Sequence, residues 1–253
     1  MQIIESIEKW KNIRKSLSKY SIGFVPTMGN LHEGHMSLIG QSVKENNITI
    51  LSIFVNPTQF NNKEDLLNYP KTLDNDIKYA QKAKVDYLIL PKEEEIYTDN
   101  FAFKISNHSS YSAIMEGKFR PSHFTGMLTI VLKLLLLVKP NKAYFGEKDY
   151  QQFLLVKEMA KAFFLDTEII SCFTIRNQNG LPLSSRNNRL TEEELKKAAL
   201  FSQLLKSELK DEEIIQKLEA ENFTVDYIEE YQNRRYGAVS LNNVRLIDNA
   251  GVK

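Results

Sequence analysis

The sequence predicts an α/β fold: a doubly wound parallel sheet covered by helices, followed by a smaller α+β unit. Three observations support this prediction. Short apolar runs typical of buried strands alternate with longer segments of helical periodicity. Polar, glycine-bearing segments follow several of these runs, at the position where an open parallel sheet binds its ligands. Near Thr191 the alternation gives way to a charged helical stretch and further strand-like runs.

The strands of the sheet are expected where apolar runs end at turn-forming residues. Ile22–Val25 is followed by a proline, and the β-branched run Ile48–Val55 is followed by Asn56-Pro57. The alternating pattern of Phe101–Ser106 suggests an additional strand. The remaining strands predicted for this sheet are Asp86–Leu90, Lys142–Phe145 and Thr167–Ile175.

Helices are expected between these strands, where apolar residues recur at intervals of three and four. The most apolar of them, Thr125–Val138, is interrupted by Lys133 and is too short to span a bilayer, so we expect a buried helix. The other helices predicted for this part of the chain are Glu33–Asn46, Thr72–Lys84 and Asp149–Phe164.

The C-terminal part has a different composition. Thr191–Glu221 is charged and helical, and Thr191 with Glu194 has the spacing of a capping box. Two strand-like runs follow, at Phe223–Tyr231 and Val239–Ile247. We therefore predict a second domain of α+β type and place the boundary so that residues 1–176 form the first domain and residues 177–253 the second.

Length, charge and cysteine content exclude several classes of protein. The chain has 253 residues and a net charge of +1, which leaves no electrostatic footprint for bulk nucleic-acid binding. Cys172 is the only cysteine, which excludes an intrachain disulfide. The stretch Met1–Tyr20 lacks the apolar core of a signal peptide. We expect a cytoplasmic protein with neither nucleic acid nor membrane as partner.

Residues 26–35 (PTMGNLHEGH) are the segment richest in chemistry, between the first strand and the first helix. Free N–H groups at a helix N-terminus attract anions, and His32 and His35 project from one face of its first turn. Gly29 and Gly34 leave room for a ligand near the backbone. A metal pair is disfavoured, because the zinc motif H-E-x-x-H has a four-residue step and no third Cys or His ligand lies nearby. A helix merely capped by polar residues stays an alternative for this segment alone.

Two later segments also place polar side chains after strands. The amides of Asn56 and Gln59 can recognise hydroxyl and carboxylate groups without adding charge. In the segment Phe145–Gln152, Lys148 offers a point charge for phosphate and Asp149 an acceptor for ribose hydroxyls. Taken singly, each segment fits a polar turn or a capped helix equally well.

A third segment, Ser184–Arg186, lies in a loop with two hydroxyls and one guanidinium, which suit phosphate oxygens and a leaving diphosphate. An ordinary surface turn is the alternative. The basic segment Glu116–Phe124 fits a site wall or a subunit contact equally well. Neither a G-x-S-x-G elbow nor a Walker A loop occurs in the sequence.

Together these segments resemble the nucleotidylyltransferase superfamily, whose paired signatures match the H-x-G-H element His32–His35 and the Ser184–Arg186 loop. The fuller set is similar to the pantothenate synthetase (pantoate–β-alanine ligase) family, in family order from Gly23 to Asn187, with a weaker match at Leu246–Asn249. The matching segments are Pro26–His35, Phe54–Phe60, Tyr69-Pro70, Glu116-Gly117, Arg120-Pro121, His123-Phe124, Phe145–Gln152 and Ser184–Asn187.

The resemblance implies a Rossmann-like first domain, a C-terminal lid and a homodimer. It implies an ATP- and Mg²⁺-dependent ligase that condenses (R)-pantoate with β-alanine through a pantoyl-adenylate, giving pantothenate, AMP and diphosphate. A nucleotidylyltransferase of the same superfamily that retains the nucleotide in its product is the alternative enzyme. A nucleotide-binding regulatory module without turnover is the non-enzymatic one.

The resemblance also assigns residues, while the Mg²⁺ ligands stay unassigned. The implied catalytic residues are His35, His32, Lys148, Ser184, Ser185 and Arg186. The implied ATP-binding residues are Met28, Gly29, Asn30, Leu31, His32, Glu33, Gly34, His35, Gly146, Glu147, Lys148, Asp149, Ile175, Leu183, Ser184, Ser185 and Arg186. The implied substrate-binding residues are Gln59 and Gln152, with Asn56 as a neighbour. We expect Gln151 to assist Gln152 in recognising the acid.

Overall fold

The computed structural model describes residues 1–252, so the last residue of the predicted second domain lies outside the described part. Its first part is a six-stranded sheet in the order β1-β4-β3-β2-β5-β6, with parallel pairing throughout. The strands are β1 (Gln2–Ile4), β2 (Ile22–Thr27), β3 (Ile48–Ile53), β4 (Tyr87–Ile89), β5 (Lys142–Gly146) and β6 (Glu168–Cys172). The predicted doubly wound α/β sheet is confirmed.

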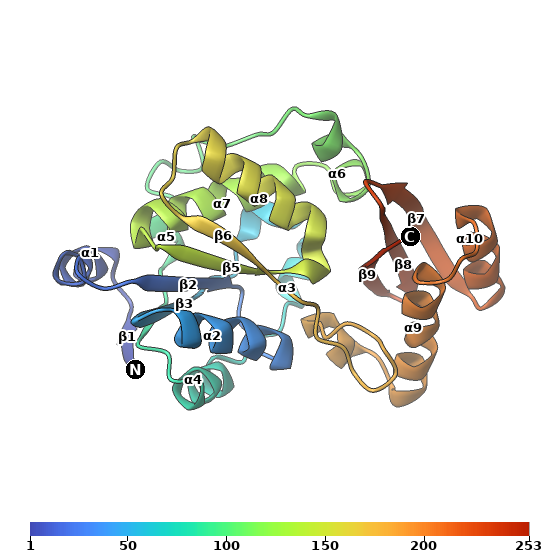
Figure 1. Ribbon diagram of the computed structural model, residues 1–253, viewed down its shortest axis with the longest axis horizontal. Helices are drawn as coiled ribbons and strands as arrows, with labels where there is room; N and C mark the ends of the chain where they lie inside the picture. The colour runs from blue at the N-terminus through green and yellow to red at the C-terminus, as the bar shows by residue number, and fades with distance from the viewer. Residues whose placement is uncertain (253) are drawn as a thin grey trace.

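Helices cover both faces of this sheet (Figure 1). Neighbouring strand residues enter different cores: Phe24 and Ile50 pack on the side of α7, whereas Val25 and Leu51 pack on the side of α2. Burial of both faces explains why these strands are continuous apolar runs rather than alternating ones. The helices are α1 (Ile7–Ser16), α2 (Glu33–Glu45), α3 (Lys63–Leu67), α4 (Leu73–Lys82), α5 (Glu93–Ile96), α6 (Glu116–Phe119), α7 (His123–Val138) and α8 (Tyr150–Ala162).

Helix α7 is the buried helix that the sequence predicted. Its one charged side chain, Lys133, donates to the carbonyl of Ile96 at 3.0 Å and to the carboxylate of Asp99 at 2.9 Å. The ammonium is therefore paired at the edge of the core rather than left unsatisfied in it. Within residues 1–252, no helix has both the length and the apolar character needed to cross a membrane.

The C-terminal part has its own sheet and its own hydrophobic cluster. In Figure 1 it lies beside the parallel sheet, next to α6. Thr191 and Glu194 form the predicted capping box. The elements are α9 (Glu192–Leu205), α10 (Asp211–Ala220) and the antiparallel strands β7 (Phe223–Tyr231), β8 (Arg234–Leu241) and β9 (Val244–Gly251).

Two predicted strands were wrong. The predicted run Val239–Ile247 straddles a two-residue turn and belongs to two strands, because Asn242 adopts a positive φ of 52° there. Phe101–Ser106 forms no strand. The N–H groups of Phe103 and Ile105 bond instead to the side chains of Asp99 at 2.7 Å and Thr129 at 2.9 Å. The short strand β1 and helix α1 were not predicted. Short 3-10 turns complete the chain, at η1 (Pro57–Gln59), η2 (Ser110–Ala113), η3 (Glu147–Asp149) and η4 (Ser185–Arg189).

Candidate active site

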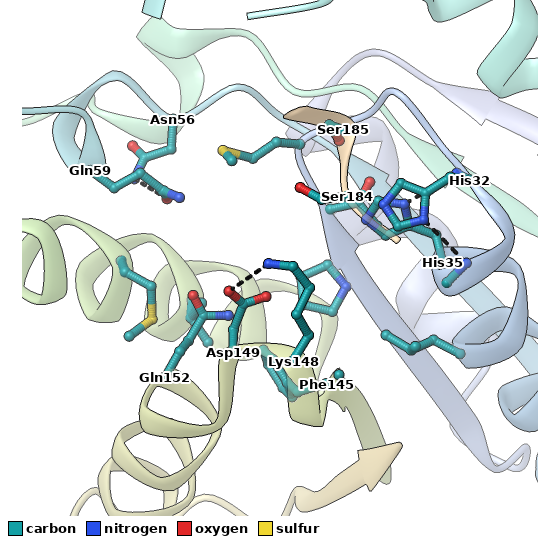
Figure 2. Close-up of a pocket in the computed structure, with 18 of the residues that line it drawn as sticks. His32, His35, Asn56, Gln59, Phe145, Lys148, Asp149, Gln152, Ser184 and Ser185 are labelled. Carbon is teal, nitrogen blue, oxygen red and sulfur yellow. Dashed lines mark hydrogen bonds and ion pairs between the residues drawn. The ribbon is translucent and has the colours of Figure 1, made fainter. Parts of the chain in front are cut away.

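A cavity of about 250 Å³ opens where β2, β3, β5 and β6 end. This is the carboxyl edge of the parallel sheet, where the sequence predicted a ligand. Figure 2 shows the amides of Asn56 and Gln59 at one end, with His32 and His35 at the other and the side chain of Lys148 between. The cavity therefore has one end with the amides of Asn56 and Gln59 and one end with the two histidines.

Histidines form both halves of the capping box at the start of α2. His32 is the N-cap, and its Nδ1 accepts from the N–H of Gly34 at 3.1 Å. The Nδ1 atom of His35 accepts from the N–H of His32 at 3.4 Å, and the two ring centroids lie 4.1 Å apart. Because both Nδ1 atoms accept, the neutral rings carry their protons on Nε2, which leaves an N–H donor on each ring for a ligand.

Burial keeps both histidines neutral at physiological pH. The pKa of His35 is lowered to about 3, first by burial and then by repulsion from a protonated His32 and from Lys148. The pKa of His32 is lowered to about 4 by burial and by Lys148, against the opposing effect of Asp149. In the unliganded protein these rings are therefore hydrogen-bond donors rather than cations.

A buried carboxylate of α4 holds the turn before α2. Asp76 accepts from the backbone N–H groups of Asn30 at 2.9 Å and of Leu31 at 2.7 Å. The turn also needs Gly29, whose φ is 81°. The N–H groups of Asn30 and Leu31 are thus bonded within the protein, whereas the Nε2–H groups of the two histidine rings are left for a ligand. Sequence reasoning missed Asp76, which comes from a distant helix.

The segment after β5 presents Lys148 and Asp149 to the cavity, with Lys148 Nζ 3.5 Å from Asp149 Oδ1. An amide of the C-terminal sheet fixes its backbone, because Asn249 Nδ2 donates to the carbonyls of Glu147 and Lys148, at 2.9 Å each. The Glu147 side chain does not line the cavity and accepts from Ser171 at 2.7 Å. A Cβ built on Gly146 would meet no atom within 4 Å, so the cavity floor is open there.

At the amide end, Asn56 is buried and fully bonded to protein. Its Nδ2 donates to Gln59 Oε1 at 3.0 Å and to the carbonyl of Gly126 at 3.2 Å. Its Oδ1 accepts from the hydroxyl of Tyr97 at 2.6 Å. Asn56 therefore orients Gln59, whose own NH₂ group is left to face the cavity.

The basic segment Glu116–Phe124, for which the sequence allowed a site wall or a subunit contact, contributes side chains to two different places. Arg120 and His123 line the cavity and both donate to the carbonyl of Gln59, at 3.3 and 2.9 Å. His123 Nε2 then accepts from Arg120 at 3.1 Å. Burial and the charge of Arg120 lower the pKa of His123 to about 4. Glu116, by contrast, reaches the C-terminal sheet.

The adjacent glutamines of α8 point to different places. Gln152 lines the cavity. The expectation that Gln151 assists it was wrong, because Gln151 is buried and donates to the carbonyls of Tyr111 at 2.8 Å and Ile114 at 3.1 Å. On a helix, consecutive side chains point about 100° apart, which separates these two roles.

The loop after β6 brings Ser184, Ser185 and Arg186 to the cavity, with the two serines beside the histidines (Figure 2). Ser184 caps η4 by accepting from the N–H of Arg186 at 3.2 Å. The base of the loop is anchored by Arg176, whose guanidinium donates to both carboxylate oxygens of Asp248 at 2.7 and 2.9 Å. The loop is therefore tied to β9 as well as to β6.

Most of the residues expected at the site come together around one cavity. Those that line it are Met28, His32, Gly34, His35, Asn56, Gln59, Gly146, Lys148, Asp149, Gln152, Ile175, Leu183, Ser184, Ser185 and Arg186. Those that do not line it are Gly29, Asn30, Leu31, Glu33 and Glu147. Sequence reasoning missed the apolar wall, which is formed by Leu38, Phe54, Phe60, Met127, Ile130, Val131, Leu134 and Phe173. Within residues 1–252, no group of three or more His, Cys, Asp and Glu side chains could hold a metal ion.

Comparisons with known proteins agree over the whole length of the chain. The family model described as pantoate-beta-alanine ligase matches residues 2–251. The chain is 54% identical to the pantothenate synthetase of Coxiella burnetii over 248 residues, 98% of this chain and 96% of the relative. It is 51% identical to that of Legionella pneumophila over 250 residues, 98% of this chain and 99% of the relative.

Solved structures give the same result. The pantoate-beta-alanine ligase of Francisella tularensis, complexed with beta-gamma ATP and beta-alanine, is similar with a TM-score of 0.94 and 46% identity, over 99% of this chain and 97% of that one. The pantothenate synthetase of Thermus thermophilus is similar with a TM-score of 0.89 and 35% identity, over 99% of both chains.

Proposed function

The chain belongs to the pantoate–β-alanine ligase family, and from that premise we propose that it joins its two acids through a pantoyl-adenylate. The activity of this family is the ligation of pantoate to β-alanine. In the proposed course, the pantoate carboxylate attacks the α-phosphorus of ATP and diphosphate leaves. The β-alanine amine then attacks the carbonyl of the mixed anhydride, loses a proton and releases AMP. No protein nucleophile is required, so the protein contributes positioning and charge stabilisation.

The observation that carries this proposal is one continuous cavity with donors at one end and uncharged amides at the other. The attack joins a nucleotide to a hydroxy acid, so both must lie in one enclosed space with the carboxylate facing the α-phosphate. A single cavity lined by both sets of side chains supports this arrangement. Exclusion of water also protects the anhydride from hydrolysis.

At the donor end, His32, His35, Lys148 and the loop Ser184–Arg186 are proposed to bind the triphosphate. The two Nε2–H groups and the loop hydroxyls are neutral donors, whereas Lys148 and Arg186 supply positive charge for the leaving diphosphate. The other nucleotide contacts that we propose are ribose at Asp149 and adenine near Ile175.

At the amide end, Gln59 and Gln152 are proposed to bind pantoate. The support for Gln59 is its free NH₂ group, which is oriented by the bond from Asn56 to the side-chain oxygen. Arg120 and His123 hold the backbone of Gln59 through its main-chain carbonyl. Amides bind the hydroxyls and carboxylate of pantoate without adding a charge that would compete with the phosphates. In this proposal Asn56 acts by orienting Gln59.

Further parts of the proposal concern Mg²⁺ and assembly. Because residues 1–252 offer no cluster of three ligand side chains, we propose that Mg²⁺ enters as part of the Mg·ATP substrate, bound by phosphate oxygens and water. We also propose a homodimer in the cytoplasm, which light scattering and cell fractionation test. A hydrophobic cluster made only of C-terminal residues supports a division at residues 176 and 177, with 177–253 as a lid. Tyr227, Tyr236 and Ala238 of the same sheet pack into the core of the first part and so join the two.

Isotope exchange tests the intermediate. With pantoate and ATP but no β-alanine, labelled diphosphate should enter ATP, and ¹⁸O from the pantoate carboxylate should appear in AMP once β-alanine is added. Exchange that requires β-alanine would overturn the adenylate. A stable nucleotide-linked product would favour the nucleotidylyltransferase alternative, and ATP binding without AMP release would favour a regulatory module.

A further inference from the structure

A carboxylate outside the cavity pairs with one of the cavity's cations. Asp65 lies on the five-residue helix α3, in the connection after β3. Its Oδ2 accepts from Arg186 Nη2 at 2.8 Å, and its Oδ1 lies 3.4 Å from Arg189 Nη1. Asp65 thus ties the turn η4 to a segment about 120 residues earlier in the chain.

The geometry leaves the functional face of Arg186 free. Arg186 lines the cavity, whereas Asp65 lines only an adjoining polar crevice, which shares Arg186 and Lys148 with the cavity. Only one nitrogen of the guanidinium contacts the carboxylate, and within residues 1–252 its Nε and Nη1 make no hydrogen bond. We propose that Asp65 is a positioning residue that holds Arg186 with these two nitrogens directed at the triphosphate. This inference rests on the proposed phosphate role of Arg186.

Charge balance explains why Arg186 needs such a partner. Two other cations, Arg120 and Lys148, also line the cavity, and like charges in one small space repel. Burial lowers the pKa of Arg120, and the charge of Arg186 lowers it further. The side chain of Arg186 is 29% exposed and can turn toward water. Its bond to Asp65 opposes that movement in the empty enzyme, so less ordering remains when ATP binds.

The first test compares ligands that differ in their phosphates. The variant Asp65→Asn keeps the size of the side chain but removes the charge. We expect its Kd for ATP and for inorganic diphosphate to rise about threefold to tenfold, the range for a partly exposed charged contact. The Kd for AMP should stay unchanged, because AMP lacks the β- and γ-phosphates. Glu64→Gln on the same helix is the matched control and should bind all three ligands as the wild type does.

The second test is a double-mutant cycle measured by calorimetry. In an Arg186→Ala background, Asp65→Asn should cause no further loss of ATP affinity. With Arg186 present, Asp65→Glu keeps the carboxylate and should bind ATP nearly as tightly as the wild type. The inference would be overturned if Asp65→Asn weakened the binding of AMP as much as that of ATP. It would also be overturned if Asp65→Asn reduced ATP affinity in the Arg186→Ala background as much as in the wild type. If Arg186→Ala itself binds diphosphate as the wild type does, the proposed phosphate role fails and the inference fails with it. If Arg186→Ala weakens diphosphate and Asp65→Asn does not, the inference alone fails.

Discussion

Arg245 of β9 donates two hydrogen bonds to the carboxylate of Glu116, at 2.6 and 2.9 Å. The same carboxylate accepts from the hydroxyl of Tyr227 at 3.0 Å and contacts Arg120 at 3.4 Å. Tyr227 and Arg245 belong to the C-terminal sheet, whereas Arg120 lines the cavity. One buried carboxylate therefore connects the C-terminal sheet to the wall of the candidate active site.

The Glu116–Arg245 pair should make the fold sensitive to acid. Burial alone would raise the pKa of Glu116, but Arg245 and Arg120 lower it to about 2. A carboxyl with a lowered folded-state pKa stabilises the protein above its unfolded-state pKa of about 4.3, and that stability is lost as the pH falls toward 2. In Arg245→Ala we expect the free energy of unfolding at pH 7 to fall by about 3 kcal/mol, the low end for a broken buried pair because Arg245 is itself 27% exposed.

Urea denaturation at pH 7, 5 and 3 measures this effect. The gap between wild type and Arg245→Ala should narrow as the pH falls, because the protonated Glu116 no longer gains from the arginine. The exposed Lys196→Ala serves as the control for loss of a positive charge. A gap of constant size across the three pH values would contradict the linkage.

The two neighbouring glutamines of α8 should fail in different ways. Gln151→Ala removes a buried amide that bonds to the carbonyls of Tyr111 and Ile114, and should lower stability by about 1–3 kcal/mol. Gln152→Ala should leave the midpoint of unfolding nearly unchanged and raise the KM for pantoate about tenfold. Steady-state kinetics and thermal unfolding of both variants provide the check. The opposite assignment of the two effects would disprove the proposed division.

How far the fold could be predicted depended on local pattern. Strands buried on both faces, such as β2 and β3, produce continuous apolar runs that are visible in the sequence. The strand β1 has three residues, too few for a period to appear. The hairpin at Asn242 turns through a left-handed asparagine without a neighbouring glycine, so its turn signal is weak.

In the candidate site, too, local features could be predicted from the sequence and long-range contacts could not. Residues within one motif, such as His32 and His35, could be placed together because the turn that joins them is local. Asp65 and Asp76 could not, since each reaches the site from a distant helix whose packing leaves no pattern in the sequence. The cavity wall on α7 has the same spacing as an ordinary core, so periodicity alone could not distinguish the two.

Removal of a ring donor should abolish most turnover. His35→Ala loses an Nε2–H group aimed at the proposed triphosphate, and we expect kcat to fall by at least about 100-fold to 1000-fold. The lost capping contact should cost only about 1 kcal/mol, so the variant should still fold. AMP release and circular dichroism measure the two effects. His108→Ala, an exposed histidine outside the cavity, should keep full activity, and near-wild-type turnover of His35→Ala would refute the assignment.

ATP binding should draw a proton onto the site. The pKa of His35 is about 3 in the unliganded protein, chiefly because of burial. A triphosphate beside the ring would favour the charged form and raise this pKa, so protons are taken up on binding at acid pH. The uptake should vanish toward pH 7, where the ring stays a neutral donor whose Nδ1 accepts from His32. Calorimetric titration with ATP in two buffers of different ionisation enthalpy measures the uptake. His35→Ala should abolish most of it, and equal uptake in wild type and variant would exclude His35 as the acceptor.

Two glycines of α2 provide a sharper test of the histidine geometry. A Cβ added to Gly34 would lie 2.8 and 2.9 Å from the ring of His32, whereas one added to Gly40 would meet nothing within 4 Å. Gly34→Ala should therefore displace the ring and lower kcat at least about tenfold, as for other lost donors. Its stability should change little, because the helix propensity gained, about 1 kcal/mol, offsets a cap contact of similar size.

Gly40→Ala is the matched control on the same helix. It should stabilise the protein by about 0.5–1 kcal/mol, since alanine replaces an unconstrained helical glycine, and leave kcat unchanged. Thermal unfolding and AMP release measured on both variants separate the two sites. Equal activity of both variants would mean that the position of the His32 ring does not matter for turnover. A loss in Gly34→Ala alone would tie the activity to the ring that caps the helix.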